Sequence, residues 1–364
     1  MLVTQQKVLR RFWYPVIPVG LLADGPKPFT LLGEEIVLWR DSAGRVAALA
    51  DRCCHRTAKL SLGFYDETGN LACGYHGWSY DVGGQCVRIP QFTRETVPAA
   101  NRVHAFKAEE KYGYVWVCLD EAPLTGIPDI SEVGQPGFRK IDQFYEVWKC
   151  AGLRLMENSF DNAHINFVHT GTFGDRKDAG EANLEFTPEE WGFRMKTSFA
   201  VKNTELASKV VKMDSAKTTR FIESTWFVPF TRRLRITYPN GLVHIIFTSA
   251  TPIDDRSSMI VQFCLRSDTE QDVPAADIIA FDREVTAEDK RILETTEFDV
   301  ALDDGRGWER HMASDKPGLM MRKKLIDVLA ANGETEVHGP RPRALWPVAT
   351  SIPPGTAPTV ASKG

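Results

Sequence analysis

The 364-residue sequence predicts an α+β protein of two domains, an all-β domain followed by a domain of sheet and helices. Three observations support this fold class. Short apolar runs separated by turn residues fill the first 125 residues. A segment rich in proline and glycine follows, and helical periodicities then flank a second series of strands. A chain of this length is sufficient for about two domains of ~100–200 residues each.

The first domain, residues 1–125, is predicted from its strands and turns. We expect strands at Glu35–Trp39, Val46–Leu49 and Tyr112–Leu119. A hairpin is expected over residues 80–87, because Gly83 and Gly84 can supply the positive φ of a tight turn. The proline- and glycine-rich segment over residues 124–137 marks the boundary.

The second domain, residues 126–335, mixes both types of periodicity. We expect a helix over residues 153–168 and strands over residues 193–201, 220–227, 233–238, 241–252 and 259–266. A further helix is expected over residues 275–298, where Ile278, Phe281, Val285 and Ile292 recur at helical spacings. The last segment, residues 336–364, is rich in proline and is expected to be an extended or disordered tail.

Composition narrows the functional classes. The formal net charge is only −4, and nothing in the composition indicates a nucleic-acid partner, so we expect none. No apolar run approaches the ~18 residues of a membrane span, and the N-terminus lacks the apolar region of a signal peptide, so we expect a cytoplasmic protein without membrane contact. Seven cysteines, an odd number, indicate thiols or metal ligands rather than a disulfide framework. The scattered ones, Cys86, Cys118, Cys150 and Cys264, are expected to be buried.

Two short motifs in the first domain predict a metal centre. Cys53-Cys54-His55 and Cys73-Gly-Tyr-His76 have the forms C-x-H and C-x-x-H, with 17 residues between His55 and Cys73. Two such turns can hold one centre from both sides. The same four residues suit a tetrahedral zinc ion or a two-iron cluster with histidines on one iron, and ligand identity alone leaves both open. Cys54 matches no ligand position and is expected to be a packed or partly exposed thiol.

A second set of candidate ligands lies in the second domain. Asp161 and His164 would share one face of a helix, but His164 and His169 would point about 140° apart. Convergence on one metal therefore requires the helix to end or deform between them. A third ligand must come from elsewhere.

The helix around residue 285 offers carboxylates as that third ligand. The candidates are Glu284, Glu288, Asp289 and Glu294. Helical periodicity places both Glu288 and Asp289 on or beside the buried face, so the spacing leaves these two open.

Together, these motifs resemble those of the Rieske non-haem iron oxygenases. The C-x-H and C-x-x-H-G-W loops, with Gly74 and Gly77 beside the ligands, are similar to the Rieske fingerprint. The segment from Asn158 to His169 is similar to the family's N-x-x-D-x-x-H-x-x-x-x-H motif. The resemblance implies that Cys53, His55, Cys73 and His76 hold a [2Fe-2S] cluster, and that His164, His169 and Asp289 hold a mononuclear Fe(II) open to O₂.

The resemblance also implies roles for several residues near the two metal centres. Glu288-Asp-Lys-Arg-Ile-Leu-Glu294 is similar to the E-D-x-x-I/L/V-E element, which favours Asp289 over Glu288 as the iron ligand. Asp161 matches an aspartate that links a cluster histidine of the neighbouring subunit to an iron ligand, and orientation of His164 alone is the alternative. Trp78 and Tyr80 are expected to shield the cluster.

The resemblance also implies an assembly and a reaction. It implies a head-to-tail homotrimer whose catalytic domain has the helix-grip form, an antiparallel sheet wrapped around a helix. Electrons would come from NAD(P)H through a separate reductase or ferredoxin, because no dinucleotide fingerprint follows a strand here. The two-residue interval between Asn158 and Asp161 is typical of the branch of vanillate and dicamba O-demethylases, methylxanthine N-demethylases and carbazole-type enzymes.

We therefore expect an oxidoreductase of aromatic compound metabolism, a monooxygenase or demethylase acting on a small aromatic or heterocyclic molecule. A ring-hydroxylating dioxygenase that forms a cis-diol is the alternative, and a Rieske electron carrier is the non-enzymatic one. Substrate contacts are expected from Phe227, Phe230, His244 and Phe247.

The basic cluster Arg232, Arg233 and Arg235 is expected to form a solvated face. Recognition of an anionic substrate or of an acidic ferredoxin is the alternative for these arginines.

Overall fold

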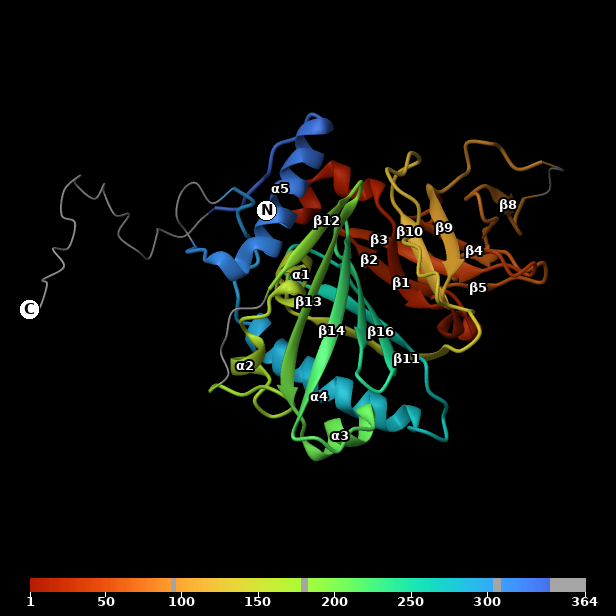
Figure 1. Ribbon diagram of the computed structural model, residues 1–364. Helices are drawn as coiled ribbons and strands as arrows, with labels where there is room; N and C mark the ends of the chain where they lie inside the picture. Colours follow the sequence, from red (N-terminus) through yellow and green to blue (C-terminus); the bar gives the residue numbers. More distant parts are fainter. Residues whose placement is uncertain (93–95, 178–182, 304–308, 341–364) are drawn as a thin grey trace, which may run out of the picture.

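The computed structural model describes residues 1–92, 96–177, 183–303 and 309–340. Its N-terminal part contains two antiparallel sheets, and its C-terminal part contains one large antiparallel sheet with helices packed against it (Figure 1). This arrangement confirms the predicted α+β fold class. Most of the expected proline-rich tail, from residue 341 onward, lies outside the described residues.

The larger sheet of the first domain has six strands in the order β1-β10-β9-β4-β3-β2. These are β1 (Tyr14–Pro18), β2 (Lys27–Leu31), β3 (Glu34–Arg40), β4 (Val46–Ala50), β9 (Ala105–Lys111) and β10 (Tyr114–Cys118). Strand β3 lies between two apolar cores. Ile36 and Leu38 enter one core, and Val37 and Trp39 enter the other, as the two-residue period of a strand requires.

The smaller sheet carries the first pair of motifs. Its strands, in the order β5-β6-β7-β8, are β5 (Phe64–Tyr65), β6 (Leu71–Ala72), β7 (Ser79–Tyr80) and β8 (Cys86–Arg88). The expected hairpin over residues 80–87 is present as β7 and β8, and Gly84 takes the positive φ of +76°. Leu60, Leu71 and Tyr80 form a core beneath the loops that follow β4 and β6.

The second domain is built on seven strands in the order β11-β17-β16-β15-β14-β13-β12. These are β11 (Arg139–Trp148), β12 (Glu185–Glu189), β13 (Gly192–Lys202), β14 (Lys217–Phe227), β15 (Thr231–Thr237), β16 (Val243–Pro252) and β17 (Ser258–Arg266). The five predicted strands correspond to β13–β17. Strand β11 was missed because a bulge between Asp142 and Phe144 interrupts its alternation.

The two faces of this sheet have different partners. On β16, His244, Ile246 and Thr248 face the helices, whereas Ile245 and Phe247 face the first domain. The ring centroids of Trp116 and Phe247 lie 5.9 Å apart across the domain interface. Alternation along one strand therefore separates the catalytic side of the sheet from the side that joins the two domains.

The helices of the second domain pack on the other face of the sheet or against one another. They are α1 (Gly152–Phe160), α2 (Ile165–Val168), α3 (Glu205–Val211), α4 (Ala275–Leu293) and α5 (Lys316–Ala331), and α4 lies across the sheet (Figure 1). The prediction that the α4 helix extends to residue 298 is wrong. The hydroxyls of Thr295 and Thr296 donate to the carbonyls of Ile292 and Leu293, which provides an alternative to further helical turns.

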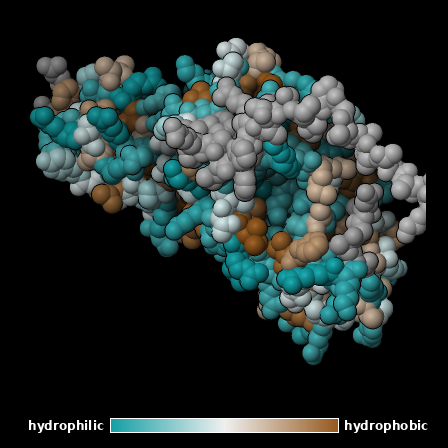
Figure 2. All heavy atoms as spheres, turned by 90° about the vertical axis from the view of Figure 1, so that its left-hand side faces the viewer, coloured by the Kyte–Doolittle hydropathy of each residue, from teal (hydrophilic) through white to brown (hydrophobic). Residues whose placement is uncertain are grey.

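The N-terminus lies beside the end of the described chain. The ammonium group of Met1 is 2.6 Å from a carboxylate oxygen of Asp299, and the amide of Leu2 donates to the carbonyl of Val337 at 2.7 Å. Hydrophilic residues cover most of the face in Figure 2, where apolar residues form small patches. Among the described residues, no helix has the length and apolar content of a membrane span.

Candidate metal centres and active site

The two cysteine–histidine loops form compact turns. Cys53 lies after β4 and Cys73 directly follows β6. The amide of Thr57 donates to the carbonyl of Cys53 at 3.0 Å, and the amide of Gly77 donates to the carbonyl of Cys73 at 2.9 Å. These bonds hold each cysteine close to the histidine of its own loop.

Within these loops the cysteines lie inside and the histidines outside. Cys53 and Cys73 are buried, at 2% and 1% exposure. Burial raises the pKa of Cys73, and the neighbouring thiol of Cys53 raises it further. The imidazole rings of His55 and His76 are half-buried, with centroids 4.6 Å apart. The four side chains thus form two pairs, one of sulfurs and one of imidazoles.

This pairing fits a two-iron cluster. A tetrahedral zinc ion needs its four donors around one point. A Rieske cluster takes two thiolates on one iron and two imidazoles on the other. Nδ1 of His55 is buried and has no hydrogen-bond partner among the described residues, so it is free to bind a metal.

Aromatic side chains surround the same loops. The ring of Trp78 stacks on His55, with centroids 4.5 Å apart and an interplanar angle of 2°. The hydroxyl of Tyr80 lies 3.0 Å from Sγ of Cys53 and 3.3 Å from Sγ of Cys54, which is exposed. A hydroxyl at a ligand sulfur stabilises its negative charge, so Tyr80 can tune the redox potential as well as shield the cluster.

The helix expected over residues 153–168 is interrupted, so that prediction is wrong. Helix α1 ends at Phe160, and Asp161 has extended dihedral angles. The carboxylate of Asp161 accepts hydrogen bonds from the amides of Ala163 at 2.7 Å and His164 at 3.2 Å. Such local bonds replace helical ones. The four-residue helix α2 follows, and His164 and His169 stand at its two ends.

Because α2 ends at Val168 and His169 has non-helical dihedral angles, the two histidines converge with Asp289. Their Nε2 atoms are 3.2 Å apart. Oδ1 of Asp289 lies 3.3 Å from Nε2 of His169 and 3.6 Å from Nε2 of His164. This oxygen is buried and has no hydrogen-bond partner among the described residues. Burial lowers the pKa of His169 to about 4, which keeps its imidazole in the neutral form that binds metals. The donor set fits the facial triad of non-haem iron.

Glu288 occupies the other side of His169. Its Oε2 lies 3.1 Å from Nδ1 of His169, so it contacts the nitrogen that faces away from Asp289. The remaining candidates are directed elsewhere, because Glu294 accepts a hydrogen bond from the amide of Lys149 and Glu284 is exposed. The contacts therefore distinguish the roles of Asp289 and Glu288, which helical spacing could not do.

Asp161 lies against the outer nitrogen of His164. Its Oδ2 is 3.4 Å from Nδ1 of His164. Burial alone would raise the pKa of Asp161, but the hydrogen bonds from His164 and Ala163 lower it below its ordinary value. The residue is therefore an anion that can orient His164.

A cavity of about 150 Å³ lies between α4 and the sheet and includes the three converging side chains. Its apolar wall contains Ile165, Phe173, Phe199, Ile222, Leu234, Ile236, Ile246, Phe281 and Val285. His244 lies in this wall, as expected, but Phe227, Phe230 and Phe247 do not. Phe230 belongs to a core beside α1, and Phe247 packs at the domain interface. Those three expectations are wrong because the chosen aromatic residues lie on other faces.

The cavity also has a polar wall that the sequence analysis missed. Oδ2 of Asp282 accepts a hydrogen bond from Nε2 of Gln143 at 2.5 Å, and Gln262 links Gln143 to Thr248. Burial raises the pKa of Asp282 to about 6. The position of Asp282, seven residues before Asp289 on the same helix, was a signal that could have identified it.

The arginine cluster on β15 divides between the two faces of the sheet. Arg233 and Arg235 form ion pairs with Glu132 on the outer face. Arg232 points the other way, into the cavity, and lies over the ring of Phe160. The expectation of one solvated face is wrong because consecutive strand residues alternate.

Both halves of the chain match known protein families. Residues 12–107 match the Rieske [2Fe-2S] domain, and residues 148–331 match the vanillate O-demethylase oxygenase C-terminal domain. Methylxanthine N1-demethylase NdmA of Pseudomonas putida is 30% identical over 91% of this chain and 92% of its own. Methylxanthine N3-demethylase NdmB of the same organism is 28% identical, over 91% and 93%.

Solved structures of related oxygenases have the same fold as this chain. The structure of NdmA from Pseudomonas putida superimposes with a TM-score of 0.76 at 28% identity, covering 91% of this chain and 94% of its own. Dicamba monooxygenase bound to dicamba reaches 0.76 at 23% identity, covering 89% and 98%, and supports the fold alone. The chain belongs to the Rieske non-haem iron oxygenases, enzymes that carry a [2Fe-2S] cluster and a mononuclear iron.

Proposed function

We propose that this protein is the oxygenase component of a multicomponent system and inserts one atom of O₂ into a C–H bond of a small aromatic or heterocyclic substrate. The observation that carries the proposal is the apolar cavity that includes the His164, His169 and Asp289 side chains. When the carbon belongs to an O- or N-methyl group, hydroxylation gives formaldehyde and the demethylated product. The second oxygen atom leaves as water, so each turnover consumes two electrons and two protons.

The proposal assigns the two metal centres to named side chains. Cys53, His55, Cys73 and His76 hold the [2Fe-2S] cluster, and the separation of sulfurs from imidazoles supports this assignment. A second set of ligands, His164, His169 and Asp289, holds the mononuclear iron, which supplies the site for O₂ activation when it is bound.

The protein positions the iron ligands and the substrate, and it keeps water away from that iron. Glu288 fixes the ring of His169 through Nδ1, and Asp161 faces the corresponding nitrogen of His164. Phe173 lies over the ring of His169, with centroids 4.9 Å apart, and forms part of the apolar wall. A substrate held against this wall is kept close to the iron and away from bulk water.

We further propose the architecture and partners that the family implies. Residues 1–125 form the Rieske domain and residues 126–335 the catalytic domain. The chain assembles as a head-to-tail homotrimer in the cytoplasm, with Asp161 linking the iron site to the cluster of the neighbouring subunit. A separate NAD(P)H-dependent reductase or ferredoxin delivers the electrons.

A reconstituted assay tests this function. The full chain, loaded with iron, is combined with NADH, a surrogate reductase and a panel of O-methyl and N-methyl aromatic compounds under ¹⁸O₂. We expect formaldehyde and a demethylated product in equal amounts from at least one compound. Replacing His164 by alanine should lower turnover by at least about 10³-fold and leave the visible spectrum of the cluster unchanged, because the cluster ligands are on other loops.

Three results would contradict the proposal. The first is a product that carries two oxygen atoms from O₂, which would identify a ring dioxygenase. The second is unchanged turnover in the His164→Ala variant. The third is the absence of demethylation and hydroxylation across the whole panel.

A further inference from the structure

Two arginines reach into the cavity from the sheet, Arg220 on β14 and Arg232 on β15. Both carry a buried Nε that has no partner. Among the described residues, neither guanidinium forms a hydrogen bond or an ion pair with the protein. Instead, Arg220 lies 4.1 Å over the ring centroid of Phe173, and Arg232 lies 5.9 Å from that of Phe160.

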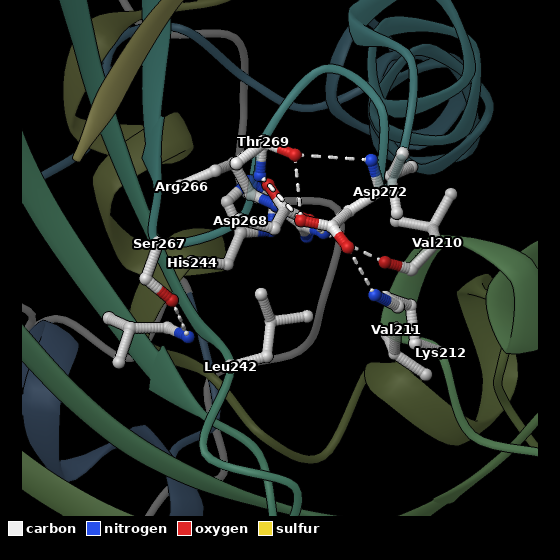
Figure 3. A network of polar contacts seen from close by, with 12 residues as sticks. Val210, Val211, Lys212, Leu242, His244, Arg266, Ser267, Asp268, Thr269 and Asp272 are labelled. Atoms are coloured by element: carbon white, nitrogen blue, oxygen red, sulfur yellow. Dashed lines mark hydrogen bonds and ion pairs between the residues drawn. The ribbon is translucent and has the colours of Figure 1, made fainter. Parts of the chain in front are cut away.

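The other buried arginines of this domain have counter-ions. Arg266 donates to Asp268 at 2.5 Å and to the carbonyl of Val210 at 2.8 Å (Figure 3). Arg322 donates to Glu157 at 2.5 Å. Arginines are seldom buried without such partners, because an uncompensated charge in a low-dielectric interior is strongly unfavourable. An anion that enters the cavity can remove that penalty.

The end of the cavity around Arg220 offers a second donor. His244 is 2% exposed, and its Nε2 has no hydrogen-bond partner among the described residues. Burial, followed by the charges of Arg220 and Arg266, lowers the pKa of His244 well below its ordinary value. The imidazole is therefore neutral. Its Nε2 lies 3.5 Å from Oδ2 of Asp282. In the tautomer with hydrogen on Nε2, the imidazole can donate a hydrogen bond to a group in the cavity.

Asp282 is the nearby carboxylate that could neutralise Arg220, but among the described residues no ion pair or hydrogen bond joins these two side chains. A carboxylate paired with a guanidinium has a depressed pKa, whereas burial raises the pKa of Asp282 to about 6 despite the charges of Arg266 and Arg220. The carboxylate of Asp282 instead contacts Nε2 of Gln143 at 2.5 Å and Nε2 of His244 at 3.5 Å. A proton taken up by Asp282 would remove its repulsion toward a second anion.

The formal charge of the cavity also favours an anion. Three carboxylates, Asp161, Asp282 and Asp289, line it together with Arg220 and Arg232. With a divalent iron bound, the sum is one positive charge, which a monoanion neutralises. Most of the remaining lining side chains are apolar, although Ser224, Thr248 and Gln262 are polar. Apolar cavities of about 150 Å³ hold a benzene ring.

We infer that the substrate is a single-ring organic anion of the carboxylate class, and that Arg220, assisted by His244, binds its anionic group. This inference rests on the proposed function for the identity of the cavity as the substrate pocket. A guanidinium matches a carboxylate with two parallel N–H···O bonds, which would place the anion at the His244 end of the cavity. The ring would lie against the apolar wall between this anchor and the triad.

Calorimetric titration of the iron-loaded full chain, without reductant, tests the inference directly. The probes are 2-, 3- and 4-methoxybenzoate, each compared with the neutral methoxybenzamide of the same geometry. We expect at least one benzoate to bind with a Kd at least about tenfold below that of its amide, because charge-assisted hydrogen bonds are the stronger ones. Arg220→Met should remove this preference while the Kd of the amide changes by less than about threefold.

Two further variants separate charge from geometry. Arg220→Lys keeps the charge but loses the planar fork, so we expect part of the preference to remain. If the methionine variant does not fold, the Arg220→Lys variant tests the inference in its place. Arg194→Met is the matched control. Arg194 lies on the neighbouring strand β13 and pairs with Glu189 at the surface, so its loss should leave the preference intact.

Several outcomes would overturn the inference. They are equal binding of benzoates and amides, no binding of any benzoate, an unchanged preference in Arg220→Met, and loss of the preference in Arg232→Met instead. Demethylation of neutral substrates without a carboxylate preference would overturn the inference and leave the proposed function standing. A carboxylate preference that depends on Arg220, without demethylation or hydroxylation, would support the inference about binding and overturn the proposed function.

Discussion

Asp289 and Glu288 are neighbours on α4, yet they contact opposite nitrogens of His169. Asp289 approaches Nε2 at 3.3 Å, and Glu288 approaches Nδ1 at 3.1 Å. Consecutive helical residues point about 100° apart, and the ring of His169 lies between the two carboxylates. A single imidazole can therefore bind a metal with one nitrogen while a carboxylate fixes the other, which is the usual arrangement of a histidine ligand.

Replacing each carboxylate tests this division. Asp289→Ala should remove the mononuclear iron, because one of three protein ligands is lost. Glu288→Gln should keep the iron but weaken its binding by about 10–100-fold, the usual effect of losing a group that orients a histidine. Iron per chain, measured after dialysis against a weak chelator, distinguishes the two. The division would be wrong if Glu288→Gln lost the iron and Asp289→Ala retained it.

At the scale of elements, glycines determine how closely the cluster loops can pack. A Cβ at Gly74 would lie 2.7 Å from the carbonyl oxygen of Leu62, and Gly77 has a φ of +74°. The sequence suggested both glycines as points of close approach beside the ligands. What it could not show was the neighbour, since Leu62 is twelve residues away from Gly74 along the chain.

Gly74→Ala should therefore separate the loops that carry the cluster. We expect the purified variant to hold less than about a tenth of the wild-type cluster, because a backbone carbonyl cannot move as a flexible side chain can. Gly20→Ala is the control, since a Cβ there meets nothing within 4 Å and the φ is not positive. The visible absorbance per chain measures both. A Gly74→Ala variant with a full cluster would contradict this explanation.

Elements with a regular period could be predicted from the sequence, and the exceptions have local physical causes. Strands β13–β17 were each expected, although β16 and β17 are buried along almost their whole length rather than at alternate residues. The break at Asp161 depends on hydrogen bonds that its side chain accepts from the amides of Ala163 and His164, which periodicity does not report. The residues that line the cavity were also predicted poorly, because the sequence pattern does not show which face of a strand is directed to the cavity. Phe247 and Ile246 are adjacent and both apolar, and only the sheet's packing shows which of them faces the cavity.

At the scale of the whole molecule, one sheet serves two purposes. Its outer face packs on the first domain through Trp116, Tyr114, Phe247 and Phe263. The inner face, together with α4, forms the cavity around the triad. The cysteine–histidine loops lie in the first domain and the three converging side chains in the second, so the two candidate centres are separate on a continuous scaffold. The motifs predicted both centres from sequence, but their relation through a shared sheet required the structure.

The claim of two separate iron centres is tested most directly by ⁵⁷Fe Mössbauer spectroscopy of the iron-loaded chain. We expect about three iron atoms per chain, two with the signal of a mixed-ligand [2Fe-2S] cluster and one with that of a mononuclear site. His164→Ala should lose only the mononuclear signal, and Cys73→Ser only the cluster signal. A chain with a single type of iron, or with zinc bound at Cys53 and Cys73, would contradict the account.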